Sequence, residues 1–211
     1  MSFVRKLTKS RDTLLDMLEL RGFNVEPFKH FSTEEVNIMY KNSTKASKEM
    51  NPIDFVATGD KNKVHVKYLF NSKPRVANLV SLVETMIDES IQDGDTLIIL
   101  VKDSLTNDQS LEIFFEELYQ NRKIFVQYFW IDMLMFNISQ HKKVPKHEVL
   151  SEKQKEEFIK SLDIKNESQL PYINKTDPVA KFMGMKTGQI CKITRPSETA
   201  GTTNYYRLCK L

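Results

Sequence analysis

The sequence has few of the patterns that mark secreted, membrane or metal-binding proteins. Its 211 residues include only two cysteines, Cys191 and Cys209, with no CxxC motif and no histidines nearby at metal-ligand spacing. Both fall in predicted strands, which favours packed thiols in a reduced compartment over a disulfide or a metal site. The start, Met1–Lys6, leads into charged residues and not into an apolar run of signal-peptide or membrane-span length. We therefore expect no membrane association and a location in the cytosol, the nucleus or a virus particle.

Catalytic motifs are also missing. There is no glycine-rich phosphate loop, no HExxH and no GxSxG. Gly188 and Gly201 are isolated turn residues, and Ser197 has no neighbouring base. His141 and His147 have no plausible metal-binding partner, so we expect surface histidines. The sequence predicts neither a cofactor nor a bound metal.

The composition, 40% hydrophobic and 28% charged, is that of an ordinary globular protein with room for one large domain or two small ones. The formal net charge of +3 is too small to indicate a nucleic-acid partner by itself. The distribution of charge is more informative, because residues 181–211 contain Glu198 as their single acid. We expect a positive potential there. The cations of this part are Lys181, Lys186, Lys192, Arg195, Arg207 and Lys210.

The first 139 residues predict an α/β domain. Strand, helix and strand patterns follow one another after a β-hairpin, so a mixed sheet covered by helices is expected. Expected helices are residues 4–21, 32 to about 48, 74 to just before 94, and about 108–119, and expected strands are 53–58, 63–70, 96–101 and 123–130. In the first helix, Arg5, Lys6, Lys9 and Arg11 are expected on a solvated face, with phosphate contact as the alternative.

A polar, basic and proline-containing stretch follows, and residues 140–150 are the expected linker. The second domain is expected over residues 151–211 as a small α+β unit. It contains a helix over 151–162, a helical turn at 168–170 and a compact helix over 177–184. Asp177 is the expected N-cap of that last helix, and Gly184 lies past its end.

The chain ends in a predicted antiparallel hairpin with a loop rich in Pro, Ser, Thr and Gly. Arg195, Glu198 and Arg207 occur close together in it. A loop held in shape by such charges is more often a docking surface than a spacer. We expect Glu198 to lie between the two arginines, whereas the alternative is an exposed pair of little energetic weight.

One enzymatic alternative rests on the earlier hairpin, which resembles a degraded metal-dependent nuclease core. Such a core needs two carboxylates for a divalent cation and a lysine that steadies the attacking water. Asp54 and Lys67 are present, but His65 stands where the second acid is needed. Asp60, in the predicted turn, would have to substitute for it.

The end of the chain resembles the assembly domain of the fifth subunit shared by eukaryotic nuclear RNA polymerases, a domain that also has an archaeal counterpart. The likeness covers about the last seventy residues, and the block Arg195–Gly201 is its most specific part. The remaining residues that carry the likeness are His141, Val144–Pro145, His147, Leu170–Pro171, Asp177–Ala180, Phe182–Gly184, Lys186, Gly188, Lys192–Ile193 and Tyr206–Leu208.

Upstream of about residue 139 the likeness rests on the order of elements. Eukaryotic members carry an N-terminal jaw domain with a nuclease-like α/β fold and no nuclease activity, whereas archaeal members lack it. The resemblance thus implies a eukaryote or a large DNA virus of eukaryotes as the source. It also implies a location in the nucleus for a cellular protein, and in the virion or the infected-cell cytoplasm for a viral one.

The resemblance further implies a non-catalytic subunit of a DNA-dependent RNA polymerase, working inside a larger assembly and not as a homo-oligomer. The second domain would dock on the largest subunit, and the first would form part of the lower jaw beside downstream duplex DNA. The implied docking residues are Lys186, Lys192, Arg195, Pro196, Ser197, Glu198, Thr199 and Arg207. The candidate DNA-proximal residues are Lys102, Ser104, Thr106 and Asn107. Asp103 and Asp108 beside them disfavour phosphate contact.

Overall fold

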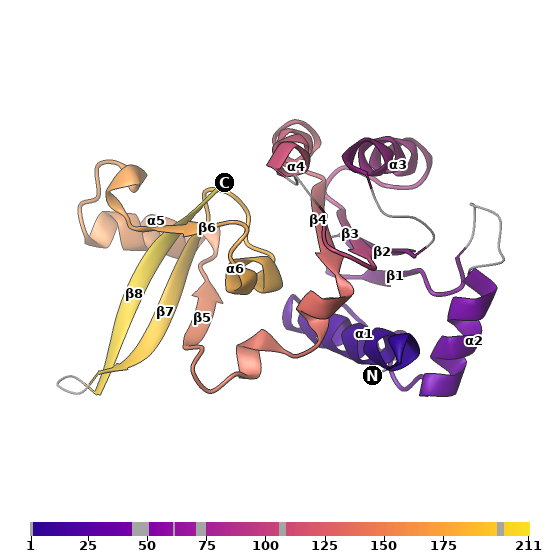
Figure 1. Ribbon diagram of the computed structural model, residues 1–211. Coiled ribbons are helices and arrows are strands. Elements are labelled where there is room, and N and C mark those ends of the chain that lie inside the picture. The colour runs from indigo at the N-terminus through magenta and orange to yellow at the C-terminus, as the bar shows by residue number, and fades with distance from the viewer. Residues whose placement is uncertain (1, 44–50, 61, 71–74, 106–108, 198–200) are drawn as a thin grey trace. The chain divides into compact units, whose positions relative to one another are not determined.

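The computed structural model describes residues 2–43, 51–60, 62–70, 75–105, 109–197 and 201–211. The chain divides into two compact units, residues 1–136 and 137–211. Each unit has its own four-stranded sheet with helices packed on it (Figure 1). None of the helices within the described residues is both long and apolar enough to span a membrane.

The sheet of the first unit is mixed and has the order β1-β2-β3-β4. It consists of β1 (Phe55–Thr58), β2 (Lys63–Leu69), β3 (Thr96–Val101) and β4 (Phe125–Trp130). The first two strands form an antiparallel hairpin, and the other neighbours are parallel. The predicted hairpin, the strand–helix–strand unit and the mixed sheet are therefore confirmed.

Helices cover both faces of this sheet, with α3 (Val76–Glu89) and α4 (Gln109–Arg122) on one side and α1 (Phe3–Leu20) on the other (Figure 1). Helix α2 (Thr33–Ser43) packs beside α1. Every residue of β3 is buried, as a continuous apolar run between two helical layers requires. Leu79 and Val83 of α3 and Phe115 of α4 join Leu97 and Ile99 in the core on their side of the sheet.

Several predicted boundaries shift. The expected end of the second helix, residues 44 to about 48, lies outside the described residues, as do the expected helix starts Pro74 and Asp108. The last strand of the first unit, β4, begins at Phe125 and not at Lys123, because Lys123 adopts a left-handed backbone with φ of 59°. The described part of the chain also contains four short 3-10 helices: Glu26–Phe28, Ile131–Leu134, Ile138–Gln140 and Glu167–Gln169.

Arg11 corrects one expectation about α1. Arg5 and Lys9 are exposed as predicted, but the Arg11 side chain is buried, with the residue only 3% exposed. Its Nη1 donates to the carbonyl of Ile53 at 3.2 Å, and its guanidinium lies 4.8 Å from the ring centre of Phe55. A planar guanidinium can donate a hydrogen bond from its edge while its face stacks on an aromatic ring, which offsets part of the cost of burying it. Arg11 therefore serves the core of the first unit.

The sheet of the second unit has the order β5-β7-β8-β6. It consists of β5 (Lys146–Val149), β6 (Tyr172–Asn174), β7 (Ile190–Ser197) and β8 (Gly201–Lys210). Only the pair of β6 and β8 is parallel. Together with the helices, the two mixed sheets confirm the predicted fold class, an α/β domain followed by a small α+β domain that ends in a hairpin.

Two helices cover opposite faces of this second sheet. Phe158 of α5 (Glu152–Ser161) packs in a cluster with Ile190 and Leu208, which are partners in the strand register. Ala180 of α6 (Pro178–Met183) packs with Cys191, which follows Ile190 and therefore points to the other face.

Residues 146–149, expected in a linker, instead form β5 and pair with β7 in register from Lys146↔Thr194 to Val149↔Cys191. The compact unit already starts at residue 137. Polar and basic side chains are typical of edge strands, because they discourage pairing with further chains. The same composition therefore suited both a linker and this edge strand.

Candidate functional site

The C-terminal hairpin extends beyond its neighbours in the sheet. Strands β7 and β8 pair from Ile190↔Leu208 to Ser197↔Gly201, whereas β5 pairs with β7 only as far as Thr194. Strand β6 pairs with β8 only from Leu208 to Lys210. The distal half of the hairpin is therefore a two-stranded ribbon (Figure 1). Its exposed residues are Arg195, Pro196, Gly201, Thr202, Asn204 and Tyr205.

Local sequence explains the shape of this hairpin. Gly188 and Gly201, at the two ends of the hairpin's strands, have φ of 87° and 70°, which residues with a Cβ rarely adopt. Across the ribbon, Thr194 donates its hydroxyl proton to Asn204 Oδ1 at 3.1 Å. At the sheet end, the ring of Tyr206 stacks on Phe158 of α5 with centroids 4.0 Å apart. The hairpin is thus anchored at one end and projects at the other.

The predicted docking residues are spread along this hairpin. Arg195 is exposed and lies 5.2 Å from the ring centre of Tyr205. Arg207 is half-buried, and its Nη1 donates to the carbonyl of Tyr172 at 3.1 Å. Arg207 pairs with Cys191, so the two arginines are separated by four residues of strand, about 13 Å. The expectation that they lie together in one loop is wrong.

The other predicted docking residues vary in exposure. Pro196 is exposed, and Lys186, Lys192 and Ser197 are half-buried. Lys192 lies across β7 from Glu148 in the register. The remaining two, Glu198 and Thr199, lie outside the described residues.

Both thiols lie in the core, as predicted. Cys191 and Cys209 are completely buried in one apolar cluster and are not joined by a disulfide. Burial raises the pKa of the Cys191 thiol to about 11, so it stays protonated at neutral pH. A protonated, inaccessible thiol is a poor nucleophile and a poor metal ligand.

In the first unit, Asp54 and Lys67 meet as the nuclease alternative expects. Lys67 Nζ lies 2.9 Å from Asp54 Oδ2, and Asp54 Oδ1 accepts the backbone N–H of Tyr68 at 2.8 Å. Burial raises the pKa of Asp54, while Lys67 and the Tyr68 N–H partly offset that rise. Both side chains are more than four-fifths buried. The pair is a nearly closed ion pair inside the fold.

The second acid required by that alternative is elsewhere. Asp54 directly precedes the register pair Phe55↔Val66, whereas Asp60 follows Thr58↔Lys63, at the other end of the hairpin. His65 lies 3.4 Å from a different carboxylate, that of Asp95. Among the described residues, no three acidic, histidine or cysteine side chains gather in a way that could hold a metal ion.

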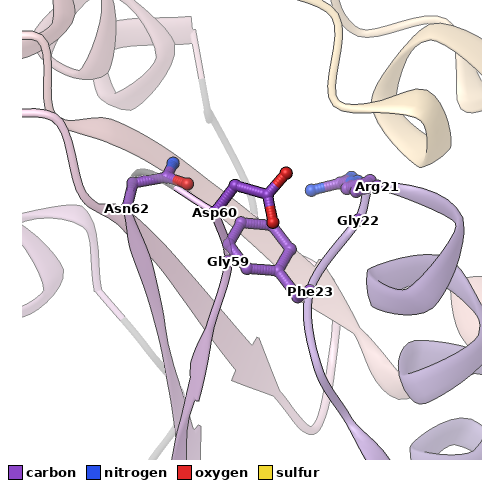
Figure 2. Close-up of a pocket in the computed structure, with 6 residues that line it drawn as sticks. All are labelled: Arg21, Gly22, Phe23, Gly59, Asp60 and Asn62. Atoms are coloured by element: carbon purple, nitrogen blue, oxygen red, sulfur yellow. The ribbon is translucent and has the colours of Figure 1, made fainter.

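Asp60 instead lies on the rim of an open depression with a volume of about 270 Å³ (Figure 2). Its carboxylate faces the guanidinium of Arg21, and Phe23 forms the floor. A Cβ at Gly59 would come within 3.0 Å of the Phe23 ring, so this glycine permits the close packing. The depression is lined by Arg21, Gly22, Phe23, Gly59, Asp60 and Asn62. Its single carboxylate offers too few ligands for a divalent cation.

The candidate DNA-proximal turn follows β3. Lys102 and Ser104 are exposed, and so is Asp103 between them. Lys102 Nζ lies 5.2 Å from the ring centre of Phe3. The other two candidates, Thr106 and Asn107, lie outside the described residues. The described part of the turn therefore carries no net charge.

Tyr205 is one exposed residue of the ribbon that composition and motifs do not identify. It lies under Arg195 because Arg195 pairs with Thr203 and Tyr205 with Ile193, on the same face of the ribbon. Tyr205 could have been identified from the sequence by pairing the residues of the two predicted strands outward from the loop, which places it diagonally across from Arg195.

Comparison with known proteins agrees with this division of the chain. A family model described as RNA polymerase Rpb5, C-terminal domain, matches residues 136–209, nearly the whole second unit. The second unit is therefore similar to the C-terminal domain of this RNA polymerase subunit.

Similarity to polymerase subunits extends over the whole chain. The DNA-directed RNA polymerases I, II, and III subunit rpabc1 of Dictyostelium discoideum is 31% identical over 210 residues, covering 99% of this chain and 100% of that protein. The corresponding subunit of Caenorhabditis elegans is 30% identical over 208 residues, covering 96% and 95%. Subunit Rpo5 of Archaeoglobus fulgidus is 52% identical over 75 residues, 36% of this chain and 97% of that protein. The chain belongs to the fifth-subunit family of DNA-directed RNA polymerases, as its sequence resemblance predicted.

Proposed function

We propose that this protein is a structural, non-catalytic subunit of a multisubunit DNA-directed RNA polymerase. The observation that carries the proposal is the full-length similarity to polymerase subunits of Dictyostelium discoideum and Caenorhabditis elegans. One copy would join the other subunits, and the chain would not form a homo-oligomer. Its location is the nucleus for a cellular polymerase, and the virion or infected-cell cytoplasm for a viral one.

In this proposal the second unit docks on the largest subunit of the polymerase. The projecting ribbon supports this role, because it carries exposed Arg195 and Pro196 away from the domain's own core. The matched family model covers the same unit. Ser197 lies at the distal end of the ribbon, Lys192 and Arg207 lie toward its sheet end, and Lys186 precedes β7. Glu198 and Thr199 connect the two strands in the sequence.

The first unit would form part of the lower jaw, close to downstream duplex DNA. Lys102 and Ser104 are exposed at the end of β3, but Asp103 offsets the charge of Lys102. Phosphate contacts depend on cations and weaken with salt. We therefore expect DNA binding by the isolated chain to be weak and lost at moderate ionic strength.

The nuclease alternative is less well supported, because Asp54 is paired with Lys67 in a nearly closed site and Asp60 lies at the far end of the hairpin. Incubation of the purified chain with DNA and Mg²⁺ tests it directly. We expect no cleavage. Metal-dependent cleavage that disappears in Lys67→Ala would establish the alternative instead.

The main proposal is tested by affinity purification of the tagged full-length chain from its natural source. We expect much larger polypeptides to co-purify in constant ratio, and mass spectrometry to identify them as polymerase subunits. A purification that recovers the tagged chain without any polymerase subunit overturns the proposal.

A further inference from the structure

The C-terminal ribbon has an open strand edge. Strand β8 runs from Gly201 to Lys210, but β6 pairs with it only at Leu208, Cys209 and Lys210. No other strand within the described residues pairs with this edge from Gly201 to Arg207. An exposed edge of this length is a template for an added strand.

Hydrogen bonds at the sheet end identify which backbone groups point to this edge. The N–H of Leu208 donates to Pro171 on the β6 side at 2.9 Å, and the carbonyl of Lys210 accepts from Lys175 on the same side at 2.7 Å. The N–H of Cys209 donates the other way, to Gln189 before β7, at 2.8 Å. Backbone groups alternate in direction along a strand. Thr202, Asn204 and Tyr206 therefore direct their N–H and carbonyl groups outward.

The opposite edge of the ribbon is blocked. The carbonyl of Ile190 accepts from Leu150 on the β5 side at 2.9 Å, so even-numbered residues of β7 point to that side. Pro196 is the even-numbered residue beyond the end of β5, and it has no N–H to offer. Proline on an edge strand prevents strand addition. The ribbon thus has one closed edge and one open edge.

Charge indicates the chemistry of the occupant. Neither β7 nor β8 contains an acidic residue, whereas the two strands contain Lys192, Arg195, Arg207 and Lys210. Arg195 is exposed on the ribbon, and Arg207 and Lys210 lie on β8 itself. A partner strand with acidic side chains would complement these cations.

We propose that the β8 edge from Thr202 to Tyr206 binds an extended, acidic segment of another polymerase subunit by strand addition. This inference rests on the proposed function and specifies how the second unit docks. Backbone hydrogen bonds from Thr202, Asn204 and Tyr206 supply the affinity. Arg195 and Arg207, which flank this edge, select the acidic segment.

The decisive variant is Asn204→Pro, which removes one outward N–H without removing a hydrogen bond to β7. Asn204→Ala is the matched control, since it also loses the side-chain bond from Thr194 but keeps the N–H. With full-length chains tagged in the natural source, we expect Asn204→Pro to lower recovery of polymerase subunits about tenfold or more, and Asn204→Ala about twofold or less. Circular dichroism must show both variants folded, and Thr202→Pro replaces Asn204→Pro if that chain does not fold.

Each outcome decides a separate question. Recovery of polymerase by wild type and Asn204→Pro alike overturns strand addition and leaves the proposed function intact. A wild-type chain that recovers no polymerase overturns the function itself. Equal losses in Asn204→Pro and Asn204→Ala assign the effect to the side chain and also overturn the inference. The inference is also overturned if sedimentation shows that the wild-type chain is a dimer and that Asn204→Pro is not, because the edge would then pair with a second copy of the chain.

Amide hydrogen exchange gives an independent readout. In the free chain, the amides of Thr203, Tyr205 and Arg207 should exchange slowly because they point to β7, whereas those of Thr202, Asn204 and Tyr206 should exchange fast. In the assembled polymerase the second set should slow at least tenfold. Fast exchange of that set in the assembly contradicts an added strand.

Discussion

The core of the first unit and the C-terminal ribbon of the second unit place their charged side chains in opposite ways. In the first unit, Arg11 is buried against aromatic rings, Lys67 is paired with Asp54, and His65 lies beside Asp95. In the second unit, Arg195 is exposed on a ribbon whose strands contain no acid. Charges that are satisfied internally stabilise their own domain, whereas an exposed cation beside an open strand edge is available to a partner. The contrast predicts that charge removal destabilises the first unit and weakens assembly by the second.

The largest expected effect is that of Arg11→Ala. The change removes the donor to the Ile53 carbonyl and the cation between the rings of Phe31 and Phe55, and it leaves a cavity. We expect a loss of about 3 kcal/mol in the free energy of unfolding of the first unit. Urea unfolding followed by the fluorescence of Trp130, the single tryptophan, reports on this unit alone.

The matched control for Arg11→Ala is Arg5→Ala, on the exposed side of the same helix. It should change the free energy of unfolding by no more than about 0.5 kcal/mol. Equal effects of the two changes would show that burial of Arg11 contributes nothing, and the contrast between the units would lose its main support.

Lys67→Met should have the next largest effect. We expect it to lower the free energy of unfolding by about 2 kcal/mol at pH 7.5, because it leaves the buried Asp54 carboxylate without its cation. Burial already raises the pKa of Asp54, and loss of Lys67 should raise it further. The folded variant therefore binds a proton at a pH where the unfolded chain does not. Its deficit relative to wild type should shrink as the pH falls toward 5.

Trp130 fluorescence during urea unfolding at several pH values measures this deficit. The double variant Asp54→Asn, Lys67→Met has no carboxylate at this place, so its deficit relative to wild type should not shrink as the pH falls. If the deficit of Lys67→Met does not shrink either, Asp54 does not titrate as its burial implies.

Local patterns predicted most of the elements. The apolar run Thr96–Val101 could only be a covered strand, and the hydroxyl-to-acid spacing at Ser32 predicted the start of α2, where Ser32 N and Oγ both bond Glu35. Asp177 caps α6 through Val179 and Ala180, and Gly184 ends it with φ of 68°, both as expected. In each case, the residues that determine the structure are close in the sequence.

What the sequence could not predict depends on residues far apart in it. Arg11 occupies a helix position next to polar neighbours, and its burial depends on Phe31, Ile53 and Phe55, which only the tertiary fold brings to it. Strands β5 and β6 have four and three residues, too few for a periodic pattern to emerge. The open edge of β8 follows from where β6 stops pairing, which no local pattern specifies.

The smallest expected effect on stability is that of Arg195→Ala, and it tests the other side of the contrast. The guanidinium lies over Tyr205 at an exposed position, where a cation–π contact contributes about 0.5 kcal/mol. Amide exchange of β7 and β8 should therefore change little. Recovery of polymerase subunits with the tagged variant should nevertheless fall about threefold at low salt, with a smaller difference at high salt, because exposed charges are screened. Arg195→Lys keeps the charge and should retain most of the recovery. A variant that loses stability but recovers polymerase normally would show that Arg195, like Arg11, serves its own domain.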